Sequence, residues 1–304
     1  MRVTEQPMTS RRDYLCLSAL AAAAGCSLPL LPAMSPAKHP QMLYGVQIAT
    51  VRREATQNLA QLLGTLHQIG FTQVELHSVV YSHPAAALRQ MIEDAGLHTP
   101  AGHFALSDIE ARLDYARELG LQYMVAMLPR PSPKGLDQFR TVAAELNQIG
   151  AHVRSHGMEF ALLFHNSELM PQGNSSGFNE LMIHTDPALV RLEVDLYWIA
   201  QAGLDPAAFL RKHKDRVKLL HLKDRLAGFP SSFTSDAGSD HSTELGKGTI
   251  PWPVLLRQAQ HQDIRYAFLD YDKVDIPILD SLKQSFAYLK TLEQEHHSQN
   301  LDPR

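Results

Sequence analysis

The chain has 304 residues, of which 44% are hydrophobic and 20% charged, and its formal net charge is −4. These proportions are typical of a soluble globular protein and exclude a disordered or fibrous chain. The negative net charge argues against nucleic acid as the main partner, and two cysteines, Cys16 and Cys26, cannot form a disulfide framework or a cysteine-ligated zinc site in the body of the chain.

The first forty residues have the pattern of an export signal. Arg11 and Arg12 precede an apolar run over residues 15–25, which is shorter than the roughly 20 residues that a membrane-spanning helix needs. This pattern predicts a signal of the twin-arginine (Tat) type and a periplasmic location. Two processing routes stay open, because lipidation at Cys26 would anchor the protein to a membrane, whereas cleavage after Ala37 would release it.

Residues 41–304 are expected to form a single domain in which strands and helices alternate. Eight short strand-like runs recur along it: Leu43–Ala49, Thr72–His77, His98–Ala105, Gln122–Leu128, Met158–His165, Val190–Asp195, Arg216–Leu222 and Arg265–Asp270. A strand followed by a helix takes about 30 residues, and most of these runs start at about that spacing. The rhythm predicts an α/β fold, a (β/α)8 TIM barrel. A doubly wound open sheet is the alternative, although no glycine-rich phosphate turn follows the first run.

Glycine and proline mark the expected helix ends. Amphipathic stretches between the strands predict helices that end at Gly70, Gly120 and Gly150. The pairs Asp186-Pro187 and Asp205-Pro206 predict helix starts, because an acidic cap is followed by proline at the first helical position.

Six of the eight predicted strands end on a carboxylate or an imidazole: Glu75, His103, His165, Asp195, His221 and Asp270. In a barrel the C-terminal ends of the strands meet at one mouth, which carries the chemistry. The longest connection, residues 225–248, is expected to overhang that mouth.

Four of these residues come from neighbouring strands and are predicted to hold one divalent metal ion: His165, Asp195, His221 and Asp270. Imidazole and carboxylate ligands suit Mn²⁺, Zn²⁺, Fe²⁺ or Co²⁺. Such a site polarises a carbonyl of a bound substrate and stabilises an enediolate.

Strand periodicity adds a second set of residues on the inner face of the barrel. Glu193 shares this face with Asp195, and Lys223 shares it with His221. Glu193 would lie deeper, as a supporting group or a buried ion-pair partner. Lys223 is predicted to stabilise a developing oxyanion or to bind a substrate hydroxyl.

Three further side chains are predicted to contact the substrate: Asn166, Tyr197 and Trp198. The two aromatic residues follow Asp195 at the rim, where an aromatic face can stack on a sugar ring. Ordinary packing at the rim is the alternative for them.

Five motifs together resemble the xylose-isomerase-like barrel superfamily, the sugar phosphate isomerase/epimerase group. They are Tyr44-Gly45-Val46-Gln47, His165-Asn166, Asp195-Leu196-Tyr197-Trp198, His221-Leu222-Lys223-Asp224, and Gly246-Lys247-Gly248 with Trp252. The resemblance runs from about Leu43 to Leu289. It implies a divalent metal held by His165, Asp195, His221 and Asp270 at the ends of strands five to eight.

The resemblance also implies candidate acids and bases. Glu75 matches a family glutamate and could supply one base, and His103 could relay the other proton. Many members have Glu where this chain has His165, or His where it has Ser167, and most have Glu in place of Asp270. Members with a His-Asn run are often associated with elimination or hydration of keto-sugars.

The leading hypothesis is a metal-dependent enzyme that moves a proton next to a carbonyl of a sugar or keto-sugar, as in sugar isomerases and epimerases. A keto-glycoside lyase or hydratase acting at the same site is an alternative, and a non-catalytic sugar-binding pseudoenzyme is another. Apurinic-site endonucleases share this barrel, but the negative net charge and the export signal argue against that activity.

Overall fold

The computed structural model describes residues 41–128, 132–234, 240–273 and 275–300. The export motif and Cys26 lie outside these residues. None of the described helices is both long enough and apolar enough to cross a membrane.

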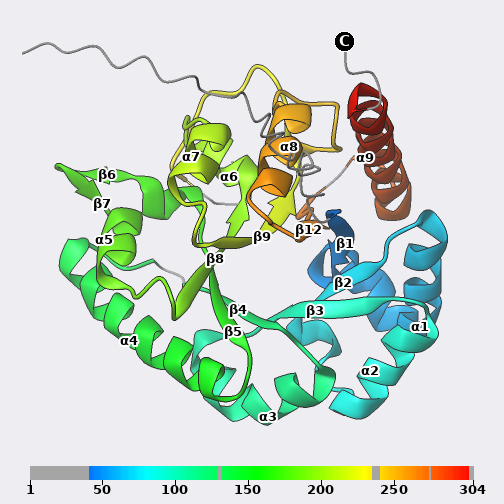
Figure 1. Ribbon diagram of the computed structural model, residues 1–304, viewed down its shortest axis with the longest axis horizontal. Coiled ribbons are helices and arrows are strands. Elements are labelled where there is room, and N and C mark those ends of the chain that lie inside the picture. The colour runs from blue at the N-terminus through cyan, green and yellow to red at the C-terminus, as the bar shows by residue number, and fades with distance from the viewer. Residues whose placement is uncertain (1–40, 129–131, 235–239, 274, 301–304) are drawn as a thin grey trace, which may run out of the picture. The chain divides into compact units, whose positions relative to one another are not determined.

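Eight parallel strands close into a barrel, in the order β1-β2-β3-β4-β5-β8-β9-β12 (Figure 1). Their bounds are β1 Leu43–Gln47, β2 Gln73–Leu76, β3 His98–His103, β4 Tyr123–Met127, β5 Glu159–Leu163, β8 Val190–Asp195, β9 Val217–Leu222 and β12 Tyr266–Leu269. Each lies within one of the eight predicted runs. The closed ring confirms the (β/α)8 prediction and excludes the open sheet, which would leave two unpaired edges.

Helices surround the barrel (Figure 1). Their bounds are α1 Arg52–Ile69, α2 Ala85–Asp94, α3 Ile109–Leu119, α4 Leu136–Ser155, α5 Gly177–His184, α6 Leu196–Gln201, α7 Pro206–Lys212, α8 Trp252–His261 and α9 Ile278–Asn300. Short 3-10 turns follow four strands: η1 Ile48–Val51, η2 Ser78–Val80, η3 Leu106–Asp108 and η4 Asn166–Leu169. Two small hairpins complete the described part: β6 Pro171–Gln172 with β7 Ser175–Ser176, and β10 Asp224–Arg225 with β11 Ser242–Thr243.

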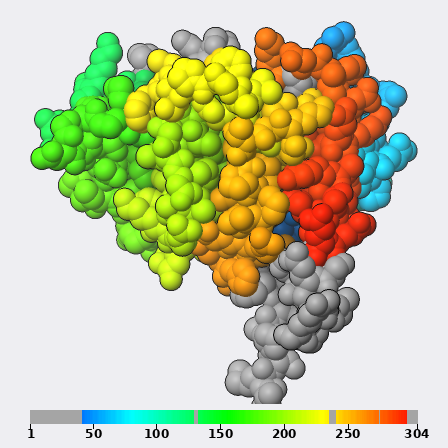
Figure 2. Space-filling model, turned by 90° about the horizontal axis from the view of Figure 1, so that it is seen from above, coloured from blue at the N-terminus to red at the C-terminus, as the bar shows by residue number. Residues whose placement is uncertain are grey.

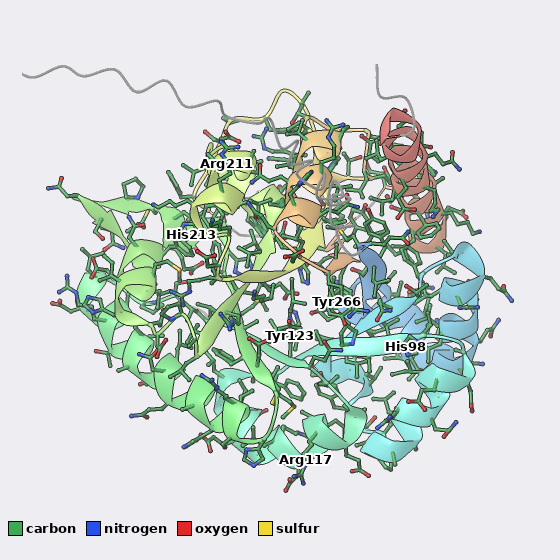
Figure 3. All side chains as sticks on the ribbon, viewed as in Figure 1. His98, Arg117, Tyr123, Arg211, His213 and Tyr266 are labelled. Atoms are coloured by element: carbon green, nitrogen blue, oxygen red, sulfur yellow. The ribbon has the colours of Figure 1, made fainter. Side chains whose placement is uncertain are left out.

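Alternate strand residues fill two separate cores. Outward-facing side chains pack under the helices, whereas a smaller cluster that includes Val125, Leu219 and Phe268 fills the barrel. Tyr123 and Tyr266 meet edge to face inside it, with ring centroids 6.4 Å apart (Figure 3). This apolar filling stops below the C-terminal ends of the strands, where the inward positions become polar.

Glycine ends two of the three helices as predicted. Gly70 and Gly120 follow α1 and α3 in the left-handed conformation, with φ of 117° and 81°. The prediction for Gly150 is wrong, because α4 continues to Ser155. A Cβ atom at Gly150 would lie 2.3 Å from the carbonyl oxygen of Leu189, so this glycine permits a close approach between α4 and the segment before β8.

One of the two predicted helix starts is also wrong. Asp186-Pro187 opens a turn, because only two residues separate Pro187 from the first residue of β8, Val190. The Asp186 carboxylate accepts a hydrogen bond from the backbone N–H of Ala188 at 2.7 Å, which closes that turn. Asp205-Pro206 does start a helix, α7, with the Asp205 side chain as its cap.

The described parts of residues 225–248 lie over the ends of β5 and β8, as expected. The side-chain amide of Asn166 donates to the carbonyl oxygen of Ser232 at 2.7 Å, and the backbone N–H of His241 donates to the Tyr197 hydroxyl at 2.8 Å. In Figure 2 this yellow segment forms a band along one edge of the surface. The connection therefore roofs part of the barrel mouth.

Candidate active site

The upper inner face of the barrel gathers five of the six predicted rim residues. Glu75 lies within β2, His103 ends β3, Asp195 ends β8, His221 lies within β9, and Asp270 directly follows β12. Alternate residues of a strand share a face, and the same face carries the apolar filling below them. The five side chains therefore project into the barrel at its C-terminal end, as the sequence predicted.

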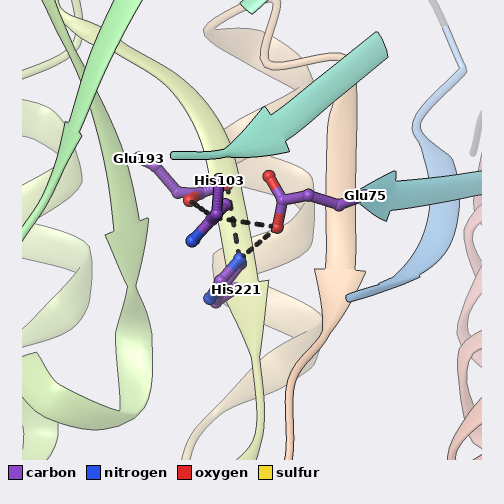
Figure 4. A group of neighbouring side chains, drawn as sticks. All are labelled: Glu75, His103, Glu193 and His221. Carbon is purple, nitrogen blue, oxygen red and sulfur yellow. Dashed lines mark hydrogen bonds and ion pairs between the residues drawn. The ribbon is translucent and has the colours of Figure 1, made fainter. Parts of the chain in front are cut away.

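Four of the inward side chains form a compact cluster, which we call the buried quartet: Glu75, His103, Glu193 and His221 (Figure 4). The Nε2 atom of His103 lies 2.8 Å from Glu193 Oε2 and 3.2 Å from Glu75 Oε2. The Nε2 atom of His221 lies 2.7 Å from Glu75 Oε2 and 3.4 Å from Glu193 Oε1. Each imidazole thus faces both carboxylates.

The quartet is almost completely buried, with His103 the most exposed member at 7%. The two imidazole rings are nearly parallel, at 7°, with centroids 5.5 Å apart. The side-chain amide of Gln47 donates to Glu75 Oε2 at 2.9 Å, which fixes this carboxylate from a third side. Because buried charges need partners, the four side chains stabilise one another as a unit.

Burial and mutual attraction set the protonation of the quartet. Burial would raise the pKa of Glu75, but the His103 and His221 imidazoliums outweigh it and hold this pKa well below its usual range. Burial, reinforced by the negative charge of Glu75, raises the pKa of Glu193 to about 7. Burial would lower the pKa of His103, but Glu75 and Glu193 raise it to about 10. At neutral pH, His103 therefore holds a proton between two carboxylates.

A second group lies at the mouth and shares one residue with the quartet. We call it the rim triad: Asp195, His221 and Asp270, whose donor atoms lie within 4.8 Å of one another. His221 joins the two groups, because its Nε2 atom faces Glu75 while its Nδ1 atom lies 3.3 Å from Asp270 Oδ2. Asp270 is the most open of the three, with 17% of its side chain exposed.

Lys223 places a positive charge directly beside the rim triad. Its side chain is fully buried, and its Nζ atom lies 3.2 Å from Asp195 Oδ2, 3.7 Å from Asp270 Oδ2 and 3.3 Å from Asp272 Oδ2. The ammonium also lies 4.9 Å from the centroid of the Trp198 ring. Three carboxylates and one ammonium leave an excess of negative charge at the mouth.

The charges at the rim reinforce one another. Burial would lower the pKa of Lys223, but Asp195 and Asp270 outweigh it and raise this pKa well above its usual value. Burial would raise the pKa of Asp270, but Lys223 and His221 hold it far below its usual range. Burial raises the pKa of Asp195 to about 6, although Lys223 opposes this shift. Additional positive charge at the rim would therefore stabilise the Asp195 carboxylate.

Both groups offer nitrogen and oxygen donors that a divalent metal can use. In the rim triad, Asp195 Oδ2 and His221 Nδ1 are buried and form no hydrogen bond of good geometry with the described part of the protein, although each lies in an ion pair, with Lys223 and Asp270 respectively. Three protein ligands beside an opening are typical of a catalytic metal site. In the quartet, both imidazole Nε2 atoms are engaged with carboxylates, and Glu75, Glu193 and His221 do not line the pocket that His103 borders. The rim triad is the better fit for a catalytic metal.

His165, the fourth predicted ligand, belongs to neither group of close donors. β5 ends at Leu163, and His165 caps η4. Its side chain accepts a hydrogen bond from the Glu168 backbone, while the Glu168 carboxylate accepts one from the His165 N–H at 2.8 Å. The His165 ring packs edge to face on Trp198, with centroids 5.5 Å apart.

The three predicted substrate contacts are engaged within the protein. The amide of Asn166 donates to the carbonyl oxygens of Ser232 and Thr234, each at 2.7 Å. Tyr197 is fully buried, and 5% of Trp198 is exposed. Both rings flank the Lys223 ammonium. Their direct contact with substrate stays a prediction.

A pocket of about 660 Å³ opens beside the quartet, at the ends of β2 to β5. His77, His103, Arg112 and His165 contribute to its wall, whereas Glu75 does not. Figure 4 shows one ring nitrogen of His103 pointing away from both carboxylates. Burial and the neighbouring His103 lower the pKa of His77. His103 is therefore the member of the quartet that borders both the buried carboxylates and the pocket.

Sequence reasoning missed two residues of the site. Gln47 ends β1 on the inner face, and strand parity could have placed it beside Glu75. Asp272 pairs with Lys223 from a loop, where no periodicity applies. Glu193 was expected as a supporting group or a buried ion-pair partner, and its ion pairs with His103 and His221 agree with the second expectation.

Comparison with known proteins shows the family to which this barrel belongs. The model of the protein family described as "Xylose isomerase-like TIM barrel" matches residues 63–292, which is most of the chain. The chain belongs to this family. It is 24% identical over 191 residues to an inosose dehydratase of Geobacillus kaustophilus, a match that covers 54% of this chain and 61% of that one. The chain thus spans less than two thirds of the curated relatives it matches.

Solved structures show the same fold. A sugar phosphate isomerase/epimerase from Parabacteroides distasonis superposes with a TM-score of 0.69 and 21% identity, over 82% of this chain and 97% of that one. An IolI protein with a bound zinc atom superposes with a TM-score of 0.65 and 14% identity, over 83% of this chain and 98% of that one.

Proposed function

We propose that this protein is a sugar-modifying enzyme that moves a proton on the carbon next to a carbonyl of a sugar or keto-sugar. The observation that carries the proposal is the double engagement of His221, whose two nitrogens connect the rim triad to the buried quartet. This arrangement combines a site for a divalent cation with a proton-holding group at one barrel mouth.

Asp195, His221 and Asp270 would hold the cation. A divalent cation bound there polarises the substrate carbonyl and stabilises the negative charge that develops on its oxygen. The Nε2–H group of His221 donates to Glu75, which fixes the ring so that Nδ1 faces the rim. Carboxylate partners of this kind orient histidine ligands and raise their basicity. In this proposal Glu75 is a positioning residue rather than the base that the sequence suggested.

His103 would exchange the proton with the substrate. It borders the pocket, while its Nε2 atom is held by Glu193 and Glu75. The second ring nitrogen faces the pocket and carries a proton at neutral pH, so His103 would donate this proton to a substrate oxygen, and the neutral imidazole would then take up the proton from the neighbouring carbon. A histidine oriented by buried carboxylates is a common general acid or base, and such a group contributes about 10²–10⁴-fold to the rate.

Lys223 would stabilise negative charge on the substrate oxygen. Its ammonium is held by Asp195 and Asp272 and cannot swing into solvent, because its side chain is fully buried. A fixed cation in a site with little water is more effective than one in solvent.

Two outcomes of the same proton transfer are open to this site. Return of the proton to a neighbouring carbon, or to the other face, gives isomerisation or epimerisation. Loss of a hydroxyl group from the next carbon, with His103 supplying the proton that converts it to water, gives dehydration. The similarity to an inosose dehydratase favours dehydration as the second candidate.

The test is deuterium exchange in D₂O with the full chain, loaded in turn with Mn²⁺, Zn²⁺, Co²⁺ and Fe²⁺. Inosose and a panel of ketoses are incubated and followed by NMR. We expect metal-dependent exchange of the proton next to the carbonyl, and its loss in His103→Gln but not in His98→Gln, a variant of the exposed histidine that begins the same strand. Ligand binding without exchange under any of these conditions would instead support a sugar-binding pseudoenzyme.

A further inference from the structure

The wall of the pocket beside the buried quartet contains more basic than acidic side chains. Arg112 and three histidines contribute to it, whereas Asp108 is the one carboxylate among its lining residues. Asp108 accepts a hydrogen bond from the Ser107 hydroxyl at 2.9 Å and forms no ion pair with Arg112 in the described part of the chain. Arg112 therefore contributes a permanent positive charge to this wall that no carboxylate of the described residues pairs with.

The Arg112 guanidinium is held in place by an aromatic ring. Its Cζ atom lies 5.3 Å from the centroid of the Tyr115 ring, one turn further along α3. The Tyr115 hydroxyl donates to the carbonyl oxygen of His83 at 2.8 Å, which fixes the ring from the neighbouring segment. Stacking of this kind orients a guanidinium without using its N–H donors. Those donors stay available to a ligand.

Neighbouring arginines differ from Arg112 in this respect. Arg117, on the same helix, pairs with Asp114 at 2.8 Å, and Arg89 on α2 pairs with Glu93 at 2.8 Å. Among the described residues no carboxylate lies within ion-pair distance of Arg112, although its side chain is half-buried. A half-buried, oriented and unpaired guanidinium in a pocket wall is typical of an anion-binding group.

We propose that Arg112 binds a carboxylate group of the substrate, so that the enzyme acts on acidic sugars of the uronate type. This inference rests on the proposed function and specifies its substrate class. A carboxylate matches the planar fork of one guanidinium in a bidentate pair. A monoanionic carboxylate adds less negative charge beside Asp108 than a dianionic phosphate would, so it fits this wall better.

The test compares three probes by isothermal titration calorimetry on the purified full chain: D-glucuronate, D-glucose and D-glucose 6-phosphate. We expect the wild type to bind glucuronate about tenfold tighter than glucose, a difference of about 1.4 kcal/mol. Arg112→Gln should remove this difference, and Arg112→Lys, which keeps the charge but loses the fork, should retain part of it. Arg117→Gln is the matched control, because Arg117 points away from the barrel (Figure 3).

Several results would overturn the inference. These are equal binding of glucuronate and glucose by the wild type, preference that survives in Arg112→Gln, or no detectable binding of glucuronate. Tighter binding of glucose 6-phosphate than of glucuronate would overturn the choice of a carboxylate. Glucuronate preference without deuterium exchange on any substrate would support Arg112 as an anion site and contradict the proposed reaction, so the two failures are distinguishable.

Discussion

The Nε2 atom of His221 lies 2.7 Å from the Glu75 carboxylate, although the two residues are 146 positions apart in the chain. This contact makes a residue of the rim triad also a member of the buried quartet. The orientation of His221 at the mouth therefore depends on a carboxylate that no solvent reaches.

Replacing Glu75 by Gln should weaken metal binding without removing a ligand. The amide oxygen of the new side chain could still accept a hydrogen bond from His221, but the lost charge would make Nδ1 a poorer donor to the metal. Loss of such a partner typically costs about 10–100-fold in metal affinity. Competition with a chelator measures the effect on the dissociation constant. Glu159→Gln is the control, because Glu159 lies at the other end of the barrel and pairs with Arg191. Equal affinities in both variants would show that Glu75 does not support the site.

Replacing Asp224 by Ala should destabilise the fold by about 3 kcal/mol or more, because hydrogen bonds to a charged group contribute about 1.5–3 kcal/mol each. The Asp224 carboxylate accepts backbone N–H groups from Arg225, Gly246, Gly248 and Ile250, at 2.8 to 3.1 Å. Urea unfolding measures the loss. Asp215→Ala, at an exposed turn, should change stability little. An equally small effect of Asp224→Ala would show that the four hydrogen bonds to the Asp224 carboxylate do not stabilise the fold.

Two glycines within helices should respond oppositely to alanine. A Cβ atom at Gly150 would meet the Leu189 carbonyl oxygen at 2.3 Å, whereas a Cβ atom at Gly64, within α1, meets nothing within 4 Å. We expect Gly150→Ala to lose about 1–3 kcal/mol and Gly64→Ala to gain about 0.5–1 kcal/mol. Thermal unfolding of both variants checks the signs, and a stabilised Gly150→Ala variant would contradict the close approach of α4 to Leu189.

His213 should make the protein less stable in mild acid. Burial beside Phe178 and Phe209, with Lys212 and Arg216 nearby, lowers its pKa from 6.5 to about 4. The unfolded chain therefore takes up this proton first, and stability falls as the pH drops from 6.5 towards 4.

His213→Asn removes that proton-linked step. Urea unfolding between pH 7 and pH 4 should show a shallower loss of stability in the variant than in the wild type. His98→Asn, at an exposed position at the start of β3, is the matched control variant. Parallel curves for wild type and His213→Asn would show that His213 does not titrate as proposed.

Strand periodicity explains why most of the site could be predicted from sequence. An inward residue near the end of a parallel strand must lie at the mouth, whatever the helices do, and this placed Glu75, His103, Asp195, His221 and Asp270 correctly. The same alternation of strand residues would have placed Gln47 beside Glu75. Periodicity ends with the strand, so it could not reveal that Asp272 pairs with Lys223.

Local capping explains why the environment of His165 differs from that of the other five predicted rim residues. The spacing of His165 and Glu168 matches a capping box, which ends β5 early and turns the chain into η4. Gly150 could not be predicted from local sequence. Its sequence context resembles that of Gly120, which ends a helix, and only the packing of α4 on Leu189 distinguishes the two glycines. Such long-range contacts leave no local pattern.

The most direct test of the central claim is the metal content of the purified full chain after loading with Mn²⁺, Zn²⁺ or Co²⁺, measured by elemental analysis beside Asp195→Asn and Asp270→Asn. If the rim triad holds the cation, the wild type should carry about one equivalent of metal and both variants should lose it. A wild type that binds no metal, or variants that keep it, would contradict the assignment of these residues as the metal site.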